Sequence, residues 1–239
     1  MRFSKWRAAG NTYLLCESVP LTPELVRAQV GDADGILEVV DVGETDAEIL
    51  VWNADGSTAE MSGNGTRIAA RWLSEKTGAD TVRIRVGDRD VVARSLPDGR
   101  IEQEMGEVRV LPPERIAGVE VVSVSVGNPH AVVIGDPTDL PLIGPLLETH
   151  ARFPNRTNVE VARVDATGEV AARVWERGVG ETLSSGTGAV AVAAATHPSG
   201  GDVLVHFPGG DLSVRLEGRS ALLRGPVERM IDVEPAKEG

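Results

Sequence analysis

The strongest constraint on the fold of this chain is an internal repeat. Residues 51–65 read VWNADGSTAEMSGNG and residues 174–188 read VWERGVGETLSSGTG, and the two segments align without a gap. Further pairs keep the same order at nearly the same separation: Gly10-Asn11 with Gly127-Asn128, Val82-x-Ile84 with Val203-x-Val205, and Gly99-Arg100 with Gly218-Arg219. Self-similarity at a fixed separation indicates a duplicated structural unit.

The repeat sets the expected domain organisation. The 239 residues suffice for two units of about 120 residues each. We expect an N-terminal unit at 1–112 and a C-terminal unit at 116–230, with the Pro-Pro-Glu-Arg segment 112–115 as the linker. In an alternative arrangement, the last strand of the chain returns to the sheet of the first unit.

Apolar periodicity predicts the secondary structure of each unit. Alternation with period two indicates strands at 47–51, 82–86 and 122–126. The run 66–76 places its apolar residues on one helical face, whereas 189–196 is apolar all round, as in a buried helix. Shorter helices are expected after Pro23 and at 140–150, and Cys16 is expected in a strand. The predicted fold class is α/β (α+β): two pseudo-symmetric units, each a β-barrel-like sheet around a central helix.

Composition excludes several function classes. The formal charge of −12 argues against nucleic acid and anionic membranes as partners. A single cysteine, Cys16, excludes an intrachain disulfide and a cysteine-based zinc cluster. The first 20 residues lack the apolar run of a signal peptide, and no apolar stretch is long enough to span a bilayer. We expect a cytoplasmic protein that binds a small molecule and no metal.

Two glycine turns are the candidate site. Ser62-Gly-Asn-Gly65 and Ser185-Gly-Thr-Gly188 each stand where a strand-like run gives way to a helix. Free amides and the dipole at a helix start bind anions, so a facing pair of loops could share one carboxylate. Matched serines on opposite sides of one carbon suggest two-base proton transfer that inverts it. Only Lys5, Lys76 and Lys237 are present, none in a recognisable cofactor context, which argues against pyridoxal phosphate and for a cofactor-free reaction.

Five segments together carry a resemblance to a known family: GNTYLL, NADGSTAEMSGNGTR, GNPHAVV, FPNRTNVEV and ERGVGETLSSGTGA. In this order they resemble diaminopimelate epimerase, whose fold is shared with proline racemase. The resemblance implies a pyridoxal-independent isomerase that interconverts LL- and meso-diaminopimelate in lysine and peptidoglycan synthesis. It also implies two pseudo-symmetric α/β units with the site in the cleft between them, and a homodimer.

The resemblance also implies roles for individual residues. Gly63, Asn64, Gly186 and Thr187 would bind the carboxylate at the reacting carbon, and Glu176 and His130 would assist the catalytic pair Ser62 and Ser185. The residues expected to hold the rest of the substrate are Asn11, Asn53, Asn128, Asn158, Glu176 and Arg177, with Arg177 on the distal carboxylate. Each residue taken singly also has a structural interpretation. The asparagines can be turn formers, His130 can be a structural histidine in a loop, and Arg177 can be half of a surface ion pair.

One departure from the family stands at the centre of the expected site. The family's two catalytic residues are cysteines, and this chain has Ser62 and Ser185 in their places. Four explanations fit: serines that work with Glu176 and His130 as relays, an engineered Cys→Ser pair, another racemase or lyase reaction of the same fold, or a diamino dicarboxylate binder without turnover. A hydroxyl is far less acidic than a thiol, whose pKa is about 8.5.

Overall fold

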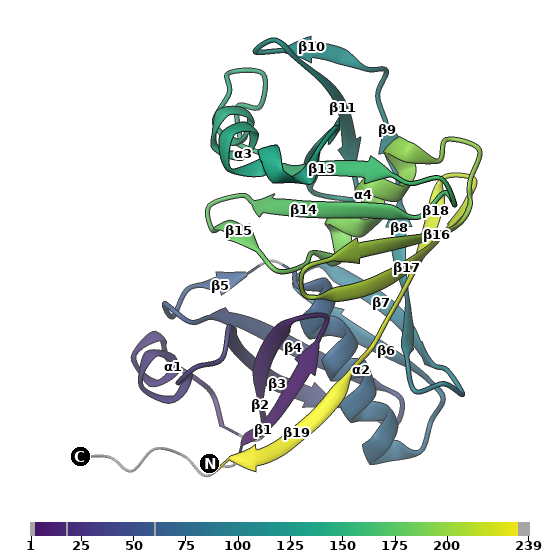
Figure 1. Ribbon diagram of the computed structural model, residues 1–239. Helices are drawn as coiled ribbons and strands as arrows, with labels where there is room; N and C mark the ends of the chain where they lie inside the picture. The colour runs from purple at the N-terminus through teal and green to yellow at the C-terminus, as the bar shows by residue number, and fades with distance from the viewer. Residues whose placement is uncertain (1–2, 18, 60, 234–239) are drawn as a thin grey trace. The chain divides into compact units, whose positions relative to one another are not determined.

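The computed structural model describes residues 3–17, 19–59 and 61–233, which form two compact units (Figure 1). One unit comprises residues 3–103 and 225–233, and the other comprises Glu104–Arg224. Both are mixed α/β structures made mostly of strands, as the fold class predicted. Within the described ranges, no helix is long and apolar enough to cross a membrane.

The first unit is one curled sheet around a long helix. Its elements are β1 (Phe3–Ala8), β2 (Asn11–Glu17), α1 (Pro23–Gln29), β3 (Gly35–Val42), β4 (Asp46–Asn53), β5 (Thr58–Ala59), α2 (Gly63–Thr77), β6 (Thr81–Val86), β7 (Arg89–Ser95), β8 (Ile101–Glu107) and β19 (Glu228–Val233). Strand β19 pairs with β1, and the order continues through β2, β3, β4, β6, β7 and β8. The β2–β3 and β4–β6 pairs are parallel, whereas the other pairs are antiparallel.

The second unit repeats this pattern. Its elements are β9 (Arg109–Val110), β10 (Glu114–Ile116), β11 (Val119–Ser125), β12 (Pro129–Ile134), the 3-10 turn η1 (Pro137–Asp139), α3 (Leu140–Glu148), β13 (Asn158–Val164), β14 (Val170–Glu176), β15 (Gly180–Thr182), α4 (Gly186–Thr196), β16 (Gly201–Phe207), β17 (Gly210–Glu217) and β18 (Ser220–Gly225). Here β12–β13 and β14–β16 are the parallel pairs, as β2–β3 and β4–β6 are in the first unit.

Strand register identifies equivalent positions in the two units. In the first unit Tyr13 lies opposite Gly35, and in the second His130 lies opposite Asn158. In the next pair of strands Leu37 lies opposite Val51, and Glu160 lies opposite Val174. The equivalent positions are therefore Tyr13 and His130, Gly35 and Asn158, and Leu37 and Glu160.

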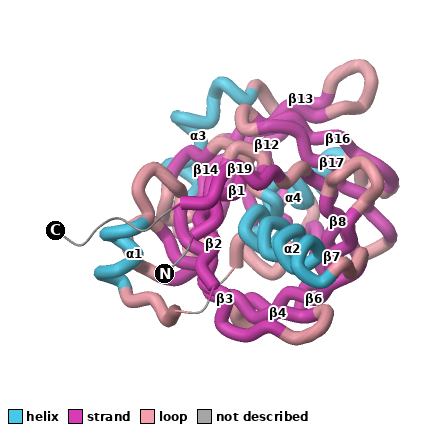
Figure 2. The backbone as a smooth tube through the Cα atoms, turned by 90° about the horizontal axis from the view of Figure 1, so that it is seen from below, coloured by secondary structure: helices cyan, strands magenta, loops and turns pink. Residues whose placement is uncertain are grey.

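Helix α2 is the centre of the first unit, with strands on several sides of it (Figure 2). Ile68, Ala69 and Leu73 have no exposed surface, as the predicted amphipathic face requires. The helix ends at Gly78, whose φ of 76° suits the left-handed position that glycine favours at a helix C-terminus. Burial of this face anchors the helix within its own sheet.

Helix α4 takes the same place in the second unit and has no polar face. Residues Ala189–Ala193 are fully buried, in agreement with the prediction of an enclosed helix. Both central helices begin earlier than their apolar runs indicate, at Gly63 and Gly186, because the preceding serines cap them. The shorter helices α1 and α3 and the strand at Cys16 also lie where they were predicted.

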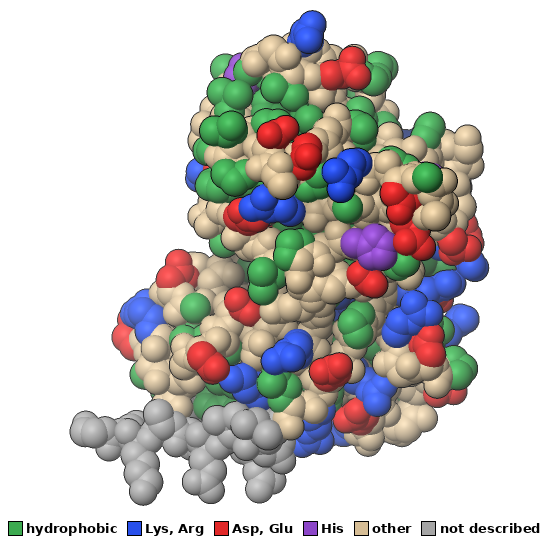
Figure 3. Space-filling model, viewed as in Figure 1, with side chains coloured by type: hydrophobic (Ala, Val, Ile, Leu, Met, Phe, Trp, Pro, Cys, Tyr) green, Lys and Arg blue, Asp and Glu red, His purple; other side chains and the backbone are tan. Residues whose placement is uncertain are grey.

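Charged side chains of both signs are interspersed over the visible face (Figure 3). Many form ion pairs on the surface, such as Arg173 with Glu181 at 2.6 Å and Arg215 with Asp202 at 2.8 Å. Exposed pairs of this kind contribute little each, typically about 0–1 kcal/mol. The stability of each unit therefore rests on its buried helix and sheet rather than on surface charge.

The packing of α2 gives the first testable prediction. Replacing Leu73 by Ala should lower the free energy of unfolding by about 2–5 kcal/mol, because a fully buried leucine leaves a cavity. Glu75→Ala, which removes only the surface pair with Arg71, should cost less than about 0.5 kcal/mol. Urea unfolding followed by circular dichroism measures both values. Equal losses for the two variants would contradict a core centred on α2.

Candidate active site

Each unit presents a serine at the start of its central helix. Ser62 precedes α2 and its Oγ accepts a hydrogen bond from Gly65 N at 3.0 Å. Ser185 precedes α4 and its Oγ accepts from Gly188 N at 3.1 Å. Serine is a favoured residue here because the first helical amides have no partner within the helix. The predicted glycine turns are therefore helix N-termini in both units.

The glycine three residues after each serine lies where a side chain would meet close neighbours. A Cβ on Gly65 would lie 2.9 Å from Leu37 Cδ2 and 3.2 Å from Ser62 Oγ. A Cβ on Gly188 would lie 2.8 Å from Glu160 Oε1 and 3.0 Å from Ser185 Cβ. The helix thus starts in direct contact with the neighbouring strand, which leaves no room for a side chain.

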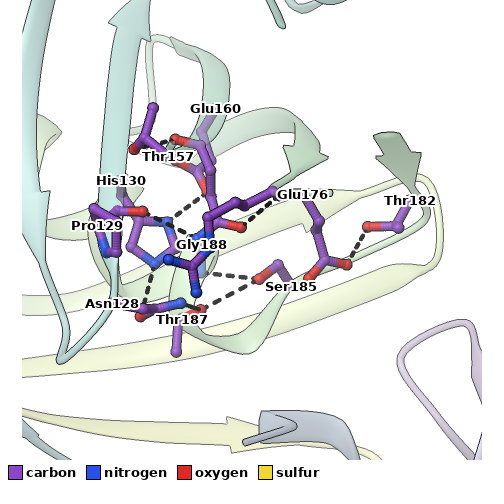
Figure 4. Close-up of polar contacts among 12 residues, drawn as sticks. Asn128, Pro129, His130, Thr157, Glu160, Glu176, Thr182, Ser185, Thr187 and Gly188 are labelled. Carbon is purple, nitrogen blue, oxygen red and sulfur yellow. Dashed lines mark hydrogen bonds and ion pairs between the residues drawn. The ribbon is translucent and has the colours of Figure 1, made fainter. Parts of the chain in front are cut away.

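A continuous hydrogen-bonded chain leads to Ser185 in the second unit (Figure 4). Glu160 Oε1 lies 2.7 Å from His130 Nδ1, and His130 Nε2 lies 3.1 Å from Asn128 Oδ1. Asn128 Nδ2 donates to Thr187 Oγ1 at 3.3 Å, and Thr187 Oγ1 lies 3.5 Å from Ser185 Oγ. The structure therefore brings three of the predicted residues, His130, Asn128 and Thr187, together beside Ser185.

Three further predicted residues lie at neighbouring strand ends of the same unit. Asn158 opens β13, where its Oδ1 accepts from Arg177 N at 2.9 Å and its Nδ2 donates to Pro129 O at 3.0 Å. Glu176 closes β14, and its Oε1 accepts from Thr182 Oγ1 at 2.5 Å. The guanidinium of Arg177 donates to Asn155 O at 3.4 Å and has no carboxylate partner among the described residues. Within the described residues, Arg177 is therefore not half of a surface ion pair.

A buried glutamate on α3 supports the turn that carries Arg177. Glu148 accepts from Gly178 N at 2.7 Å and from Trp175 Nε1 at 2.8 Å, and lies 2.7 Å from Arg156 Nη2. Burial opposes ionisation of Glu148, but these hydrogen bonds and the charge of Arg156 hold its pKa below the ordinary value. The turn after β14 is thus held to α3 by an ionised side chain.

The first unit has a different set of partners at its serine. Tyr13 Oη lies 3.1 Å from Ser62 Oγ, at the position equivalent to His130. Asn64 Nδ2 donates to Asn11 Oδ1 at 2.5 Å, which joins two of the predicted residues. The side chain next to Ser62 is therefore a phenol, whereas the equivalent position near Ser185 holds an imidazole.

Arg67 places a buried cation in the first turns of α2. Its side chain is fully buried and donates to Asn64 Oδ1, and burial lowers its pKa to about 10. Val190 is the equivalent residue in α4. An arginine adds positive charge to a helix start whose dipole is already positive, so this end of α2 attracts anions.

Two other residues considered from the sequence lie outside these networks. Asn53 donates to Ser57 Oγ at 2.9 Å within an exposed turn, and this contact is that of a turn former. Cys16 is buried in β2, and desolvation is the main reason that its pKa is raised. A buried thiol with a raised pKa is a poor nucleophile or base.

Sequence reasoning missed Tyr13, Arg67 and Glu160. The repeat itself contained the signal for Tyr13, because the sequence alignment that matches Asn11 with Asn128 also matches Tyr13 with His130. Glu160 is a single charge within the otherwise apolar run Val159–Ala162, which is a pattern that signals a buried polar residue. Among the described residues, no group of His, Cys, Asp and Glu side chains is arranged to hold a metal ion.

Comparison with known proteins gives consistent matches. The diaminopimelate epimerase family model matches residues 21–111 and 122–230. The chain is 40% identical over 261 residues to the diaminopimelate epimerase of Thermobifida fusca (strain YX), covering 95% of this chain and 94% of that protein. It is 33% identical to the protein of that name from Pelotomaculum thermopropionicum, covering 98% of each.

Solved structures show the same fold at low sequence identity. A predicted epimerase from Pseudomonas aeruginosa is similar with a TM-score of 0.77, 15% identity and 99% of each chain covered. A hydroxyproline epimerase from Agrobacterium vitis, with bound trans-4-hydroxy-L-proline, is similar with a TM-score of 0.70 and 16% identity, covering 98% of this chain and 91% of that one. These likenesses concern the fold alone.

The two helix caps give the second prediction. Ser62→Ala and Ser185→Ala should each lower the free energy of unfolding by about 1 kcal/mol, because each leaves one buried helix amide without its acceptor. Ser220→Ala, at an exposed position that caps no helix, should have almost no effect. Thermal unfolding of the three variants measures this difference. If the Ser185 and Ser220 variants melt alike, Ser185 does not act as a cap.

Proposed function

Because the chain belongs to the diaminopimelate epimerase family, we propose that it is a cofactor-independent isomerase. It inverts the α-carbon of LL-diaminopimelate to give meso-diaminopimelate, in lysine and peptidoglycan biosynthesis. The observation that carries the proposal is the matched pair of serine-capped helix starts, one in each unit, within a chain related to these epimerases over nearly its full length.

The substrate carboxylate at the reacting carbon is the anion that the two helix starts would bind. In this proposal the amides at Gly63-Asn64 and Gly186-Thr187 donate to that carboxylate. Negative charge that develops when the α-proton leaves is delocalised into the carboxylate, where fixed donors and helix dipoles stabilise it. Arg67 adds a positive charge near the first of these helix starts.

Proton transfer would use one serine on each face of the carbon. Ser62 and Ser185 take the acid and base roles, and Glu176 and His130 assist them. A serine hydroxyl needs a nearby base to function in this way. The chain of contacts from Glu160 through His130, Asn128 and Thr187 to Ser185 supports assistance by positioning in the second unit, because the Asn128 amide between His130 and Thr187 relays no proton.

The remaining polar residues would hold the rest of the substrate. Asn11, Asn53, Asn128 and Asn158 supply amide donors and acceptors, and Arg177 binds the distal carboxylate. Arg177 is partly exposed and has no carboxylate partner in the part of the chain that the structure describes, so its guanidinium is open to an external one.

We also propose that the protein is a homodimer and that it is located in the cytoplasm. Light scattering on the purified protein would test the homodimer.

A second candidate is a diamino dicarboxylate binder without turnover. What favours it is the presence of Ser62 and Ser185 at the positions where the resemblance implies catalytic cysteines, since a hydroxyl is much the weaker acid. Loss of α-hydrogen into deuterated water separates the two candidates, because a binder exchanges no hydrogen. Identification of the product separates an epimerase of diaminopimelate from another racemase or a lyase.

The serines give the third prediction. Changing Ser62 and Ser185 together to Cys should raise α-proton exchange from diaminopimelate by about tenfold or more, or create it. Helix N-termini lower thiol pKa values toward the working pH, where acid–base catalysis is most efficient. Exchange is measured from each stereoisomer for the parent, both single variants and the double variant, with exposed Ser220→Cys as the control. An active parent that loses activity in the double variant would make the serines the working pair.

Arg177 gives the fourth prediction. Arg177→Ala should weaken the binding of diaminopimelate by roughly 1.5–3 kcal/mol, because a charged hydrogen-bonded contact is lost. A monocarboxylate analogue without the distal group should bind the variant and the parent nearly equally. Arg163→Ala, which removes a charge from an exposed position on β13, is the matched control. Calorimetry that gives equal losses for both ligands would remove Arg177 from the distal site.

A further inference from the structure

The second unit buries a carboxylate that its fold does not require. Glu160 lies in the middle of β13 with no exposed surface, as does the imidazole of His130 that it contacts. Its Oε1 lies 2.7 Å from His130 Nδ1, whereas its Oε2 has no hydrogen-bond partner among the residues that the structure describes. A buried acid with one oxygen unsatisfied is destabilising relative to an apolar side chain.

Comparison of the two units shows what the fold accepts at this position. The equivalent residue in the first unit is Leu37, which meets the helix start at Gly65 as Glu160 meets it at Gly188. A leucine therefore fills this place against a serine-capped helix without loss of the fold. The presence of a carboxylate in the second unit needs an explanation other than packing.

The contacts of His130 supply that explanation. Asn128 uses its Nδ2 to donate to Thr187, so the atom facing His130 Nε2 is the acceptor Oδ1, and Nε2 must carry a proton. Nδ1 faces Glu160, and a proton shared between them completes that contact. With both ring nitrogens engaged, the imidazole cannot rotate, and Asn128 and Thr187 are held in turn.

We propose that Glu160 is a positioning residue of the active site, an inference that rests on the proposed epimerase function. It holds the His130 ring with Nε2 directed toward Asn128, which in turn contacts Thr187 at the start of α4, and thereby orders the contacts that reach Ser185. Glu160 itself does not touch the substrate. Residues that orient metal-binding histidines typically change activity by about tenfold to a hundredfold when replaced, and we expect an effect of that order here.

The test uses the residue that the other unit already accommodates. Glu160→Leu should fold, because a leucine fills the equivalent place in the first unit, but it should melt below the parent because it leaves the buried His130 Nδ1 without a partner. Its kcat for diaminopimelate should fall by about tenfold to a hundredfold, with KM nearly unchanged. Glu160→Gln keeps the size of the side chain and a hydrogen-bond partner for Nδ1, so it should melt close to the parent, while its kcat should still fall because an amide holds the ring less firmly than a carboxylate does. The control is Glu38→Gln. Glu38 is a buried glutamate of the first unit that follows Leu37 in β3, and its side chain accepts a hydrogen bond from Trp52 Nε1.

A spectroscopic readout separates this inference from the proposed function. Nitrogen-15 NMR of the His130 side chain should show Nδ1 and Nε2 both in hydrogen bonds in the parent, and a changed Nδ1 signal in Glu160→Leu. The signals of His150, His197 and His206 should stay in place. If the parent exchanges no α-hydrogen, the proposed function fails, and an unchanged His130 spectrum would independently overturn the positioning role.

Two kinetic results would also overturn the inference. One is a Glu160→Leu variant that folds and keeps the parent's kcat, since Glu160 would then have no influence on Ser185. The other is a loss of kcat in Glu160→Gln matched by the same loss of thermal stability, which would make Glu160 a structural residue only. Loss of kcat in Glu160→Gln at retained stability, together with the change at His130 Nδ1 in Glu160→Leu, supports the proposal.

Discussion

Both units depend on a hydrogen bond from a buried helix amide to a serine hydroxyl. The central helices are enclosed by their sheets, so the amides of the first turn cannot all be satisfied by water. Ser62 and Ser185 supply the acceptor at Gly65 and Gly188. The same hydroxyls stand where an anion would meet the helix dipole, so one residue in each unit combines a structural contact with the proposed chemistry.

The two units share a framework but differ in the charges placed within it. Tyr13 contacts the serine of the first unit, and the equivalent His130 belongs to the chain that reaches the serine of the second. Leu37 in the first unit corresponds to Glu160 in the second, and Arg67 in α2 corresponds to Val190 in α4. A symmetric scaffold therefore presents two chemically distinct serines. This asymmetry is what a reaction that distinguishes the two faces of one carbon would use.

Much of the fold followed from local patterns in the chain. The apolar runs located α2 and α4 because a helix buries residues at regular spacing, and an all-apolar run such as Ala189–Ala195 has no face for solvent. The N-termini of these helices were located by the serine-glycine turns, since Gly63 and Gly186 carry no apolar signal of their own. Among the site residues, His130 and Asn128 were found through motifs. Glu160 was not, since a single charge within a strand gives no indication of the histidine on the neighbouring strand.

The sequence by itself determined the duplication, the two serine-glycine turns and the family, because these depend on residue order alone. Tertiary structure decided which side chains touch. Parallel pairing of β12 with β13 brings Glu160 beside His130 across 30 positions of sequence, and the start of α4 brings Thr187 to Asn128 across 59 positions. Such contacts arise from strand register and helix placement, which are properties of the packed sheet and not of any local segment.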